Sequence, residues 1–125
     1  MEKTKMLKKN YEFKNVFSKG KYYSGKCIEV FVLENREQYK NLLGIAISVK
    51  IGKATKRNHI KRLIRENYKN FENKIKTGYT FVFLWKKKVD IKNANYINIK
   101  TDMEKIFEKV GAFKEEQQWK IYWYL

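Results

Sequence analysis

Residues 50–65 read KIGKATKRNHIKRLIR, a stretch that is rich in cations and contains no acidic residue. From Lys56 to Lys76 the apolar residues recur at helical spacing, and Gly78 follows as a stop signal. The apolar set comprises Ile60, Leu63, Ile64, Tyr68, Phe71 and Ile75. The other side of the same helix carries Arg57, Lys61, Arg65 and Lys69, with Asn58 and Arg62 beside them. The pattern predicts a helix with one packing face and one exposed basic face.

Strand-like runs lie on both sides of this helix. Residues 27–33 are rich in β-branched and aromatic side chains, and residues 42–49 are apolar again after the polar, turn-like residues 34–37. We predict that these two runs pair, after a shorter strand near Tyr22 and Tyr23. Residues 79–85 form an apolar and aromatic run too short for a core helix, which predicts a buried strand that Lys86, Lys87 and Lys88 end in solvent.

Two further helices are predicted near the ends of the chain. Asn10 can cap a helix over 11–19 that places Phe13, Val16 and Phe17 on one face, with Gly20 just past its end. Asn95 can cap another that Gly111 ends. The apolar side of the latter holds Tyr96, Ile99, Met103, Ile106, Phe107 and Val110. The order α, three strands, α, β, α in 125 residues predicts one domain of mixed α+β class.

The tail from Lys114 to Leu125 is aromatic and carries Trp119, Tyr122, Trp123 and Tyr124. We expect it to pack on the core or on a partner rather than to stack on bases.

Composition suggests the class of partner. The chain has 29 Lys and Arg against 13 Asp and Glu, for a formal net charge of +16, and such an excess attracts a polyanion. A single cysteine, Cys27, excludes an internal disulfide, which favours a reducing compartment and leads us to expect a cytoplasmic protein. The N-terminus lacks a signal-peptide core, and no window approaches the roughly 20 apolar residues of a membrane span.

The residue types needed for independent catalysis are not grouped in the sequence. Enzymes that hydrolyse phosphodiesters usually gather carboxylates around metal ions or pair a histidine with another group. Here His59 is the only histidine, and the acids are scattered as single residues that we expect on helix surfaces. Gly44 and Gly52 stand alone, so there is no glycine-rich phosphate loop. We therefore expect no catalytic residue and no metal site.

Cations also precede the basic helix. Lys50, Lys53 and Lys56 extend the basic face into the loop before it, where helix N–H groups and the helix dipole favour phosphate. Cations at this end are unfavourable by themselves, so an external anion explains them best. Two alternatives remain open at this point: a solvated basic face without a ligand, and a helix in a DNA groove. The second is weak because no turn-linked helix pair precedes the basic helix.

Residues 56–66, KRNHIKRLIRE, resemble the signature, usually written RNR, of the bacterial ribonuclease P protein family. Lys50, Gly52, Lys53 and Ala54 stand in the family's usual places before it. The similarity extends over about residues 7–113 and leaves 114–125 outside. One departure is His59, which occupies the second arginine position. Because a histidine carries less charge than an arginine at neutral pH, this contact is either weaker or a neutral hydrogen bond.

The resemblance implies an α-β-β-β-α-β-α fold, a two-layer α/β sandwich that is ribosomal protein S5 domain 2-like, with a left-handed βαβ crossover. It also implies that a catalytic RNA, which together with the substrate binds Mg²⁺, removes the 5′ leader from precursor tRNA. The protein would bind and position these RNAs, without an obligate protein partner. The alternative is a ribosomal or generic structured-RNA-binding protein with no processing role.

The resemblance further implies two binding surfaces. The surface for the catalytic RNA would comprise Lys50, Lys53, Lys56, Arg57, Asn58, His59, Lys61, Arg62 and Arg65. The leader would lie in a cleft between the first helix and the sheet, against Phe13, Phe17 and Phe31. From spacing alone, Phe13 and Phe17 fit a core role better than a role in leader binding, and only the resemblance favours the cleft.

Overall fold

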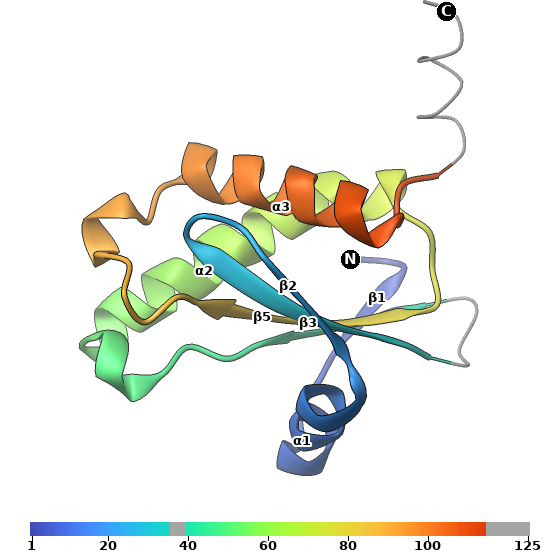
Figure 1. Cartoon of the computed structure of the whole chain (residues 1–125), viewed down its shortest axis with the longest axis horizontal. Helices are drawn as coiled ribbons and strands as arrows, with labels where there is room; N and C mark the ends of the chain where they lie inside the picture. The colour runs from blue at the N-terminus through green and yellow to red at the C-terminus, as the bar shows by residue number, and fades with distance from the viewer. Residues whose placement is uncertain (36–39, 115–125) are drawn as a thin grey trace, which may run out of the picture.

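A computed structural model describes residues 1–35 and 40–114 of the chain (Figure 1). The elements are β1 (Thr4–Met6), α1 (Asn10–Lys19), β2 (Lys21–Ser24), β3 (Ile28–Glu34), β4 (Asn41–Ile45), α2 (Ala54–Phe71), β5 (Tyr79–Trp85) and α3 (Tyr96–Val110). Short 3-10 turns occur at η1 (Val49–Ile51), η2 (Glu72–Lys74) and η3 (Ile91–Asn93). The aromatic tail, apart from Lys114, lies outside the described residues. No described helix is long and apolar enough to cross a membrane.

The five strands found among the described residues form one sheet in the order β1-β4-β5-β3-β2. The predicted pairing of residues 27–33 with 42–49 is wrong, because β5 lies between them, parallel to β4 and antiparallel to β3. Strand β5 takes this central place because it is apolar on both faces: Phe81, Val82 and Phe83 are all fully buried. The β4–α2–β5 connection joins neighbouring parallel strands. It is the βαβ unit for which the resemblance implies a left-handed crossover.

Helices cover the two faces of the sheet unequally (Figure 1). Helices α2 and α3 lie together on one face and complete the predicted two-layer sandwich, whereas α1 lies on the opposite face. The main core fills the space beneath α2 and α3 with large side chains that include Tyr68, Phe81, Phe83 and Phe107. A smaller cluster beneath α1 is built on Leu7, Val16 and Val82. The alternation of side chains along β5 sends its residues to both clusters.

Strand β1 was not expected from the sequence, because residues 1–9 are charged and have no strand-like pattern. It pairs in parallel with β4, with Thr4 opposite Asn41. The Thr4 hydroxyl also lies 2.8 Å from the hydroxyl of Tyr68 on α2. Burial raises the pKa of Tyr68 to about 12, so this hydroxyl stays protonated and available for the hydrogen bond. The strand is therefore held by backbone pairing, by one buried polar contact and by the packing of Met6 against the main core.

The capping and stop residues predicted from the sequence agree most closely with the observed helix ends in α3. Asn95 caps this helix through its Oδ1, which accepts from the backbone N–H of Asn98 at 2.8 Å, and Gly111 ends it at a φ of +76°. Helix α1 differs at its start: Asn10 is its first residue rather than its cap. The Glu12 carboxylate instead accepts from the backbone N–H of Lys9 at 3.1 Å.

Helix α2 starts and ends earlier than predicted. It begins at Ala54, so Lys56 lies in its first turn and not in the preceding loop. It ends at Phe71, yet Ile75 is still fully buried in the main core, and its backbone forms a bridge with Phe113 beyond α3.

A buried carboxylate fastens α3 to the connection between β2 and β3. Asp102 is 3% exposed, which corrects the expectation that the acids lie on helix surfaces. Its oxygens accept hydrogen bonds from the backbone N–H groups of Lys26, Cys27 and Ile28 at 3.0, 2.7 and 3.1 Å. A Cβ at Gly25 would lie only 2.5 Å from the Asp102 Cγ, so the connection needs glycine for this close approach. Asp102 therefore holds the β2–β3 hairpin in place.

Candidate nucleic-acid interface

Helix α2 divides into a buried and an exposed face, as its sequence pattern predicts. Ile60, Ile64 and Tyr68 are fully buried against the sheet and α3. The structure brings all the predicted residues for the catalytic RNA onto this helix and the short turn before it. Lys50, Lys53, Lys56, Asn58, His59, Arg62 and Arg65 are exposed, and Arg57 and Lys61 are half-buried. We call this set the basic face.

The N-terminal end of α2 carries an excess of positive charge. Lys53 is the cap residue and makes no side-chain capping bond, and no acidic residue lies in the first turn. The first N–H groups and the dipole of the helix add partial positive charge at the same place. The clustering of positive charge at the N-terminal end of α2 is therefore unfavourable without a ligand, and a bound phosphate would stabilise it.

Arg57 offers a donor that the described residues leave unused. Its Nε is buried and has no hydrogen-bond partner within the described part of the chain. A buried donor without a partner costs about 1–3 kcal/mol. An acceptor from a bound ligand would remove that cost.

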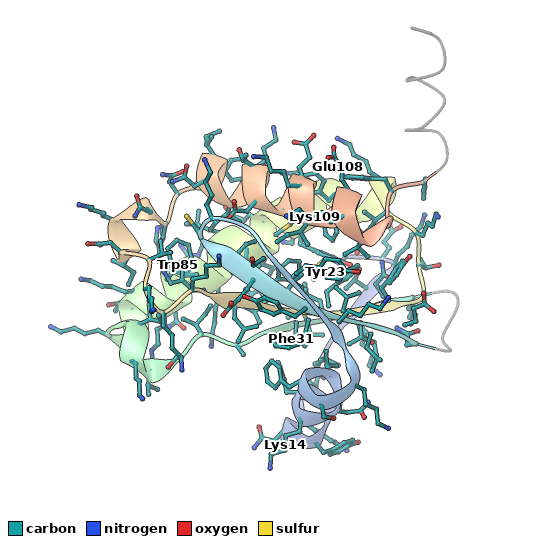
Figure 2. The ribbon with its side chains drawn as sticks, viewed as in Figure 1. Lys14, Tyr23, Phe31, Trp85, Glu108 and Lys109 are labelled. Carbon is teal, nitrogen blue, oxygen red and sulfur yellow. The ribbon has the colours of Figure 1, made fainter. Side chains whose placement is uncertain are left out.

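A second surface is aromatic and lies on the side of the sheet that α1 covers. Phe17 on α1 meets Phe31 on β3 edge-on, with ring centroids 5.2 Å apart and planes at 84°. Tyr22 on β2 lies directly opposite Phe31, and the ring centroids of the two are 5.3 Å apart. Phe17 and Tyr22 are 37% and 52% exposed. We call these three residues the aromatic surface; Figure 2 labels Phe31, which lies between the sheet and α1.

Tyr22 was not predicted for this surface. Its hydroxyl donates a hydrogen bond to the Glu29 carboxylate, which raises the pKa of Tyr22 and fixes the orientation of the ring. The alternation of side chains along the β2–β3 hairpin was the only available signal, and it depends on a register that the sequence did not specify.

Phe13 and Phe17 have different environments although they lie one turn apart on α1. The ring of Phe13 packs against Gly44 on β4, where a Cβ would lie 2.6 Å from the Phe13 Cε1. Phe13 is half-buried and belongs to the cluster beneath α1. Phe13 therefore packs, as the core alternative suggested, while Phe17 presents an exposed ring.

A hollow of about 590 Å³ opens between α1 and the sheet. Its lining residues are Leu7, Tyr11, Glu12, Asn15, Val16, Leu33, Glu34, Asn35, Leu42 and Thr80. None of the three phenylalanines predicted for the cleft lines it. The two carboxylates in this lining, from Glu12 and Glu34, disfavour a phosphate backbone. The aromatic surface is thus separate from this hollow.

The described residues offer neither a metal site nor a reactive thiol. Within residues 1–35 and 40–114, no three His, Cys, Asp or Glu side chains stand close enough to hold a metal ion. Cys27 is buried, and that burial raises the pKa of its thiol, so it stays protonated. The chemistry that this arrangement supports is binding of an anionic, base-bearing polymer.

A family model and several known proteins are similar to this chain in sequence, and all of them are ribonuclease P proteins. The family model named Ribonuclease P matches residues 1–111. A ribonuclease P protein component of Clostridioides difficile (strain 630) is 36% identical over 108 residues, covering 86% of this chain and 92% of the relative. One from Caldanaerobacter subterraneus subsp. tengcongensis is 34% identical over 117 residues, covering 94% and 98%.

Solved structures show the same similarity in three dimensions. The RNase P protein of Staphylococcus aureus superposes with a TM-score of 0.76 at 28% identity, covering 87% of this chain and 97% of that one. The RNase P protein from Thermotoga maritima superposes with a TM-score of 0.74 at 25% identity, covering 84% and 96%.

Proposed function

Because the chain belongs to the ribonuclease P protein family, we propose that its basic face binds the catalytic RNA while its aromatic surface holds the 5′ leader of precursor tRNA. The chain is a ribonuclease P protein component of bacterial type, a subunit of a ribonucleoprotein endoribonuclease. In that role it supports tRNA 5′ processing together with the RNA subunit. The comparisons lend no support to the alternative of a ribosomal or generic RNA-binding protein.

The observation that carries the proposal is the placement of the family signature on the exposed side of α2. Its cations lie at a helix N-terminus that has no acidic residue in its first turn, and the buried Nε of Arg57 there has no partner among residues 1–35 and 40–114. Both features are satisfied by phosphates of a structured RNA. His59 is exposed on the same helix and can donate or accept a neutral hydrogen bond.

The proposal for the leader is supported by the chemistry of the aromatic surface. A single strand exposes the faces of its bases, and stacking on an aromatic ring stabilises binding by about 1–3 kcal/mol per base without demanding a sequence. The exposed rings of Phe17 and Tyr22 and the half-buried ring of Phe31 form a connected group suited to this. Lys14 precedes Phe17 by one helical turn and supplies a nearby cation for the backbone.

Mg²⁺ has no fitting set of ligands among the described side chains, so we assign it to the RNA subunit and the substrate. Hydrolysis is then carried out by the RNA, and the protein alone cleaves nothing. We further propose that the protein acts in the cytoplasm and needs no other protein subunit.

Reconstitution tests the function directly. The protein together with a cognate ribonuclease P RNA is expected to process precursor tRNA at Mg²⁺ concentrations where the RNA alone is slow. The measurement is the rate of 5′-leader release with RNA alone, protein alone and both. Absence of stimulation by the protein would contradict the proposal. Equal affinity for tRNA with and without a leader, together with association with ribosomes, would instead favour the generic RNA-binding alternative.

Salt dependence tests the basic face. If Arg57 and Arg62 each neutralise a phosphate, Arg57→Ala and Arg62→Ala should flatten the dependence of catalytic-RNA affinity on salt. The logarithmic slope is about −0.7 to −0.9 per phosphate contact, so each variant should change it by somewhat less than one. Titrations of RNA binding at several salt concentrations measure this slope. Slopes equal to that of the wild-type protein would remove these arginines from the interface.

A further inference from the structure

Lysines from two distant parts of the sequence face one pocket beside the start of α2. The pocket has a volume of about 420 Å³. Its lining residues are Lys50, Ile51, Lys56, Lys87, Lys88, Val89, Asp90 and Ile91. One wall comes from η1 and the first turn of α2, and the other comes from the loop between β5 and η3. The sequence pattern suggested only that Lys87 and Lys88 end a strand in solvent.

Four lysines and one aspartate line this pocket, so the charge around it is strongly positive. The carboxylate belongs to Asp90, whose Oδ1 accepts from the backbone N–H of Lys92 at 2.9 Å and caps η3. Within the part of the chain that the structure describes, Asp90 makes no ion pair with the lysines of the pocket. The four ammonium groups therefore repel one another unless an anion lies between them.

The loop that carries Lys87 and Lys88 is held in place by its own contacts. The backbone N–H of Val89 donates to the carbonyl of Lys86 at 3.2 Å and closes a turn with the two lysines at its tip. The indole N–H of Trp85 donates to the carbonyl of Val89 at 3.0 Å, on the other side of that turn. These two hydrogen bonds therefore fix the backbone position of Lys87 and Lys88.

An apolar contact holds the two walls together. Ile51, Val89 and Ile91 all pack against the main core. A Cβ at Gly52 would lie 3.4 Å from the Ile91 Cδ1, which places Ile91 close against the turn before α2. The pocket is therefore a feature of the folded chain and not a chance approach of two long side chains.

We propose that this pocket binds a backbone phosphate of RNA and that Lys87 and Lys88 extend the basic face onto the β5–η3 loop. The proposal rests on the proposed function, because Lys50 and Lys56 belong to both the pocket and the basic face. A phosphate between the two walls removes the repulsion among the four ammonium groups. The catalytic RNA is the expected source of the phosphate, because the pocket is continuous with the surface proposed to bind it.

The test compares two double variants with the same change in net charge. Lys87→Ala/Lys88→Ala removes the second wall, whereas Lys100→Ala/Lys105→Ala removes two exposed lysines from α3, outside the pocket. The salt slope is measured for the binding of catalytic RNA to the protein and of precursor tRNA to the assembled enzyme. We expect the first variant to reduce the slope for the catalytic RNA by about 0.7 or more, and the control variant to leave it at the wild-type value.

The outcomes separate this inference from the proposed function. A slope reduced only in the precursor tRNA measurement keeps the phosphate pocket and assigns its phosphate to the substrate. Equal slopes for the two double variants in both measurements overturn the pocket, and if the wild-type protein still stimulates processing, the proposed function stands. A wild-type protein that neither binds the catalytic RNA nor stimulates cleavage overturns both.

Discussion

Replacing Asp102 with alanine is expected to lower the free energy of unfolding by at least about 2 kcal/mol, because the buried backbone N–H groups of Cys27 and Ile28 and the part-buried N–H of Lys26 lose their acceptor. Each unsatisfied buried donor costs about 1–3 kcal/mol. Asp102 is 3% exposed and its three hydrogen bonds measure 2.7–3.1 Å, so water has little access to the buried N–H groups of Cys27 and Ile28 in the folded protein. Equilibrium unfolding in urea measures the effect.

Two further variants sharpen this prediction. Asp102→Asn keeps the shape but replaces one oxygen with an NH₂ group, which faces a backbone donor in either orientation of the amide, so it should also destabilise the protein. Glu104→Ala removes an exposed carboxylate from the same helix and should change the unfolding free energy by no more than about 0.5 kcal/mol. A loss below about 1 kcal/mol for Asp102→Ala would mean that the hairpin does not depend on this carboxylate.

Replacing Phe17 and Phe31 together with leucine is expected to weaken precursor tRNA binding by the assembled enzyme about tenfold or more. Stacking is worth about 1–3 kcal/mol per base, and leucine keeps the apolar bulk while removing the aromatic face. Affinity for mature tRNA and assembly with the catalytic RNA should stay nearly unchanged. Binding titrations with leader-bearing and leaderless tRNA measure the difference.

Tyr11→Leu is the matched control for the leader surface. Tyr11 lies on the same helix and is 65% exposed, but it lines the hollow between α1 and the sheet instead of the aromatic surface. It should leave both tRNA affinities unchanged. If Tyr11→Leu weakens leader binding and the phenylalanine variant does not, the leader lies in the hollow. Arg62→Ala should show the opposite pattern, weakening assembly with the catalytic RNA while sparing the preference for a leader.

The features of the fold that the sequence predicts correctly depend mostly on residues close together in the chain. The faces of α2 follow from residues three and four positions apart, and the ends of α3 follow from Asn95 and Gly111. A helix makes its hydrogen bonds within its own segment, so its location and its exposed face can be predicted without its neighbours. The family signature lies within one such helix, which is why the basic face was also predicted residue by residue.

The partners of each strand could not be predicted in the same way. Strands β3 and β4 are neighbours in the sequence, but burying the apolar β5 on both faces requires it to lie between them. Strand β1 is only three residues long, with a charged residue at its centre, and its backbone bonds to β4 could be made by almost any sequence. Strand pairing is decided by long-range burial, which local spacing does not encode.

The helices, the α+β class, the family resemblance and the basic face of this protein could therefore be predicted from the amino-acid sequence. The burial of Asp102, the contact between the Tyr22 and Phe31 rings, and the pocket that Lys87 and Lys88 share with the start of α2 are visible only in three dimensions. Each of these features joins residues from separate elements. Such contacts form only when the sheet order and strand register are set, because burial of apolar surface across the whole chain selects them.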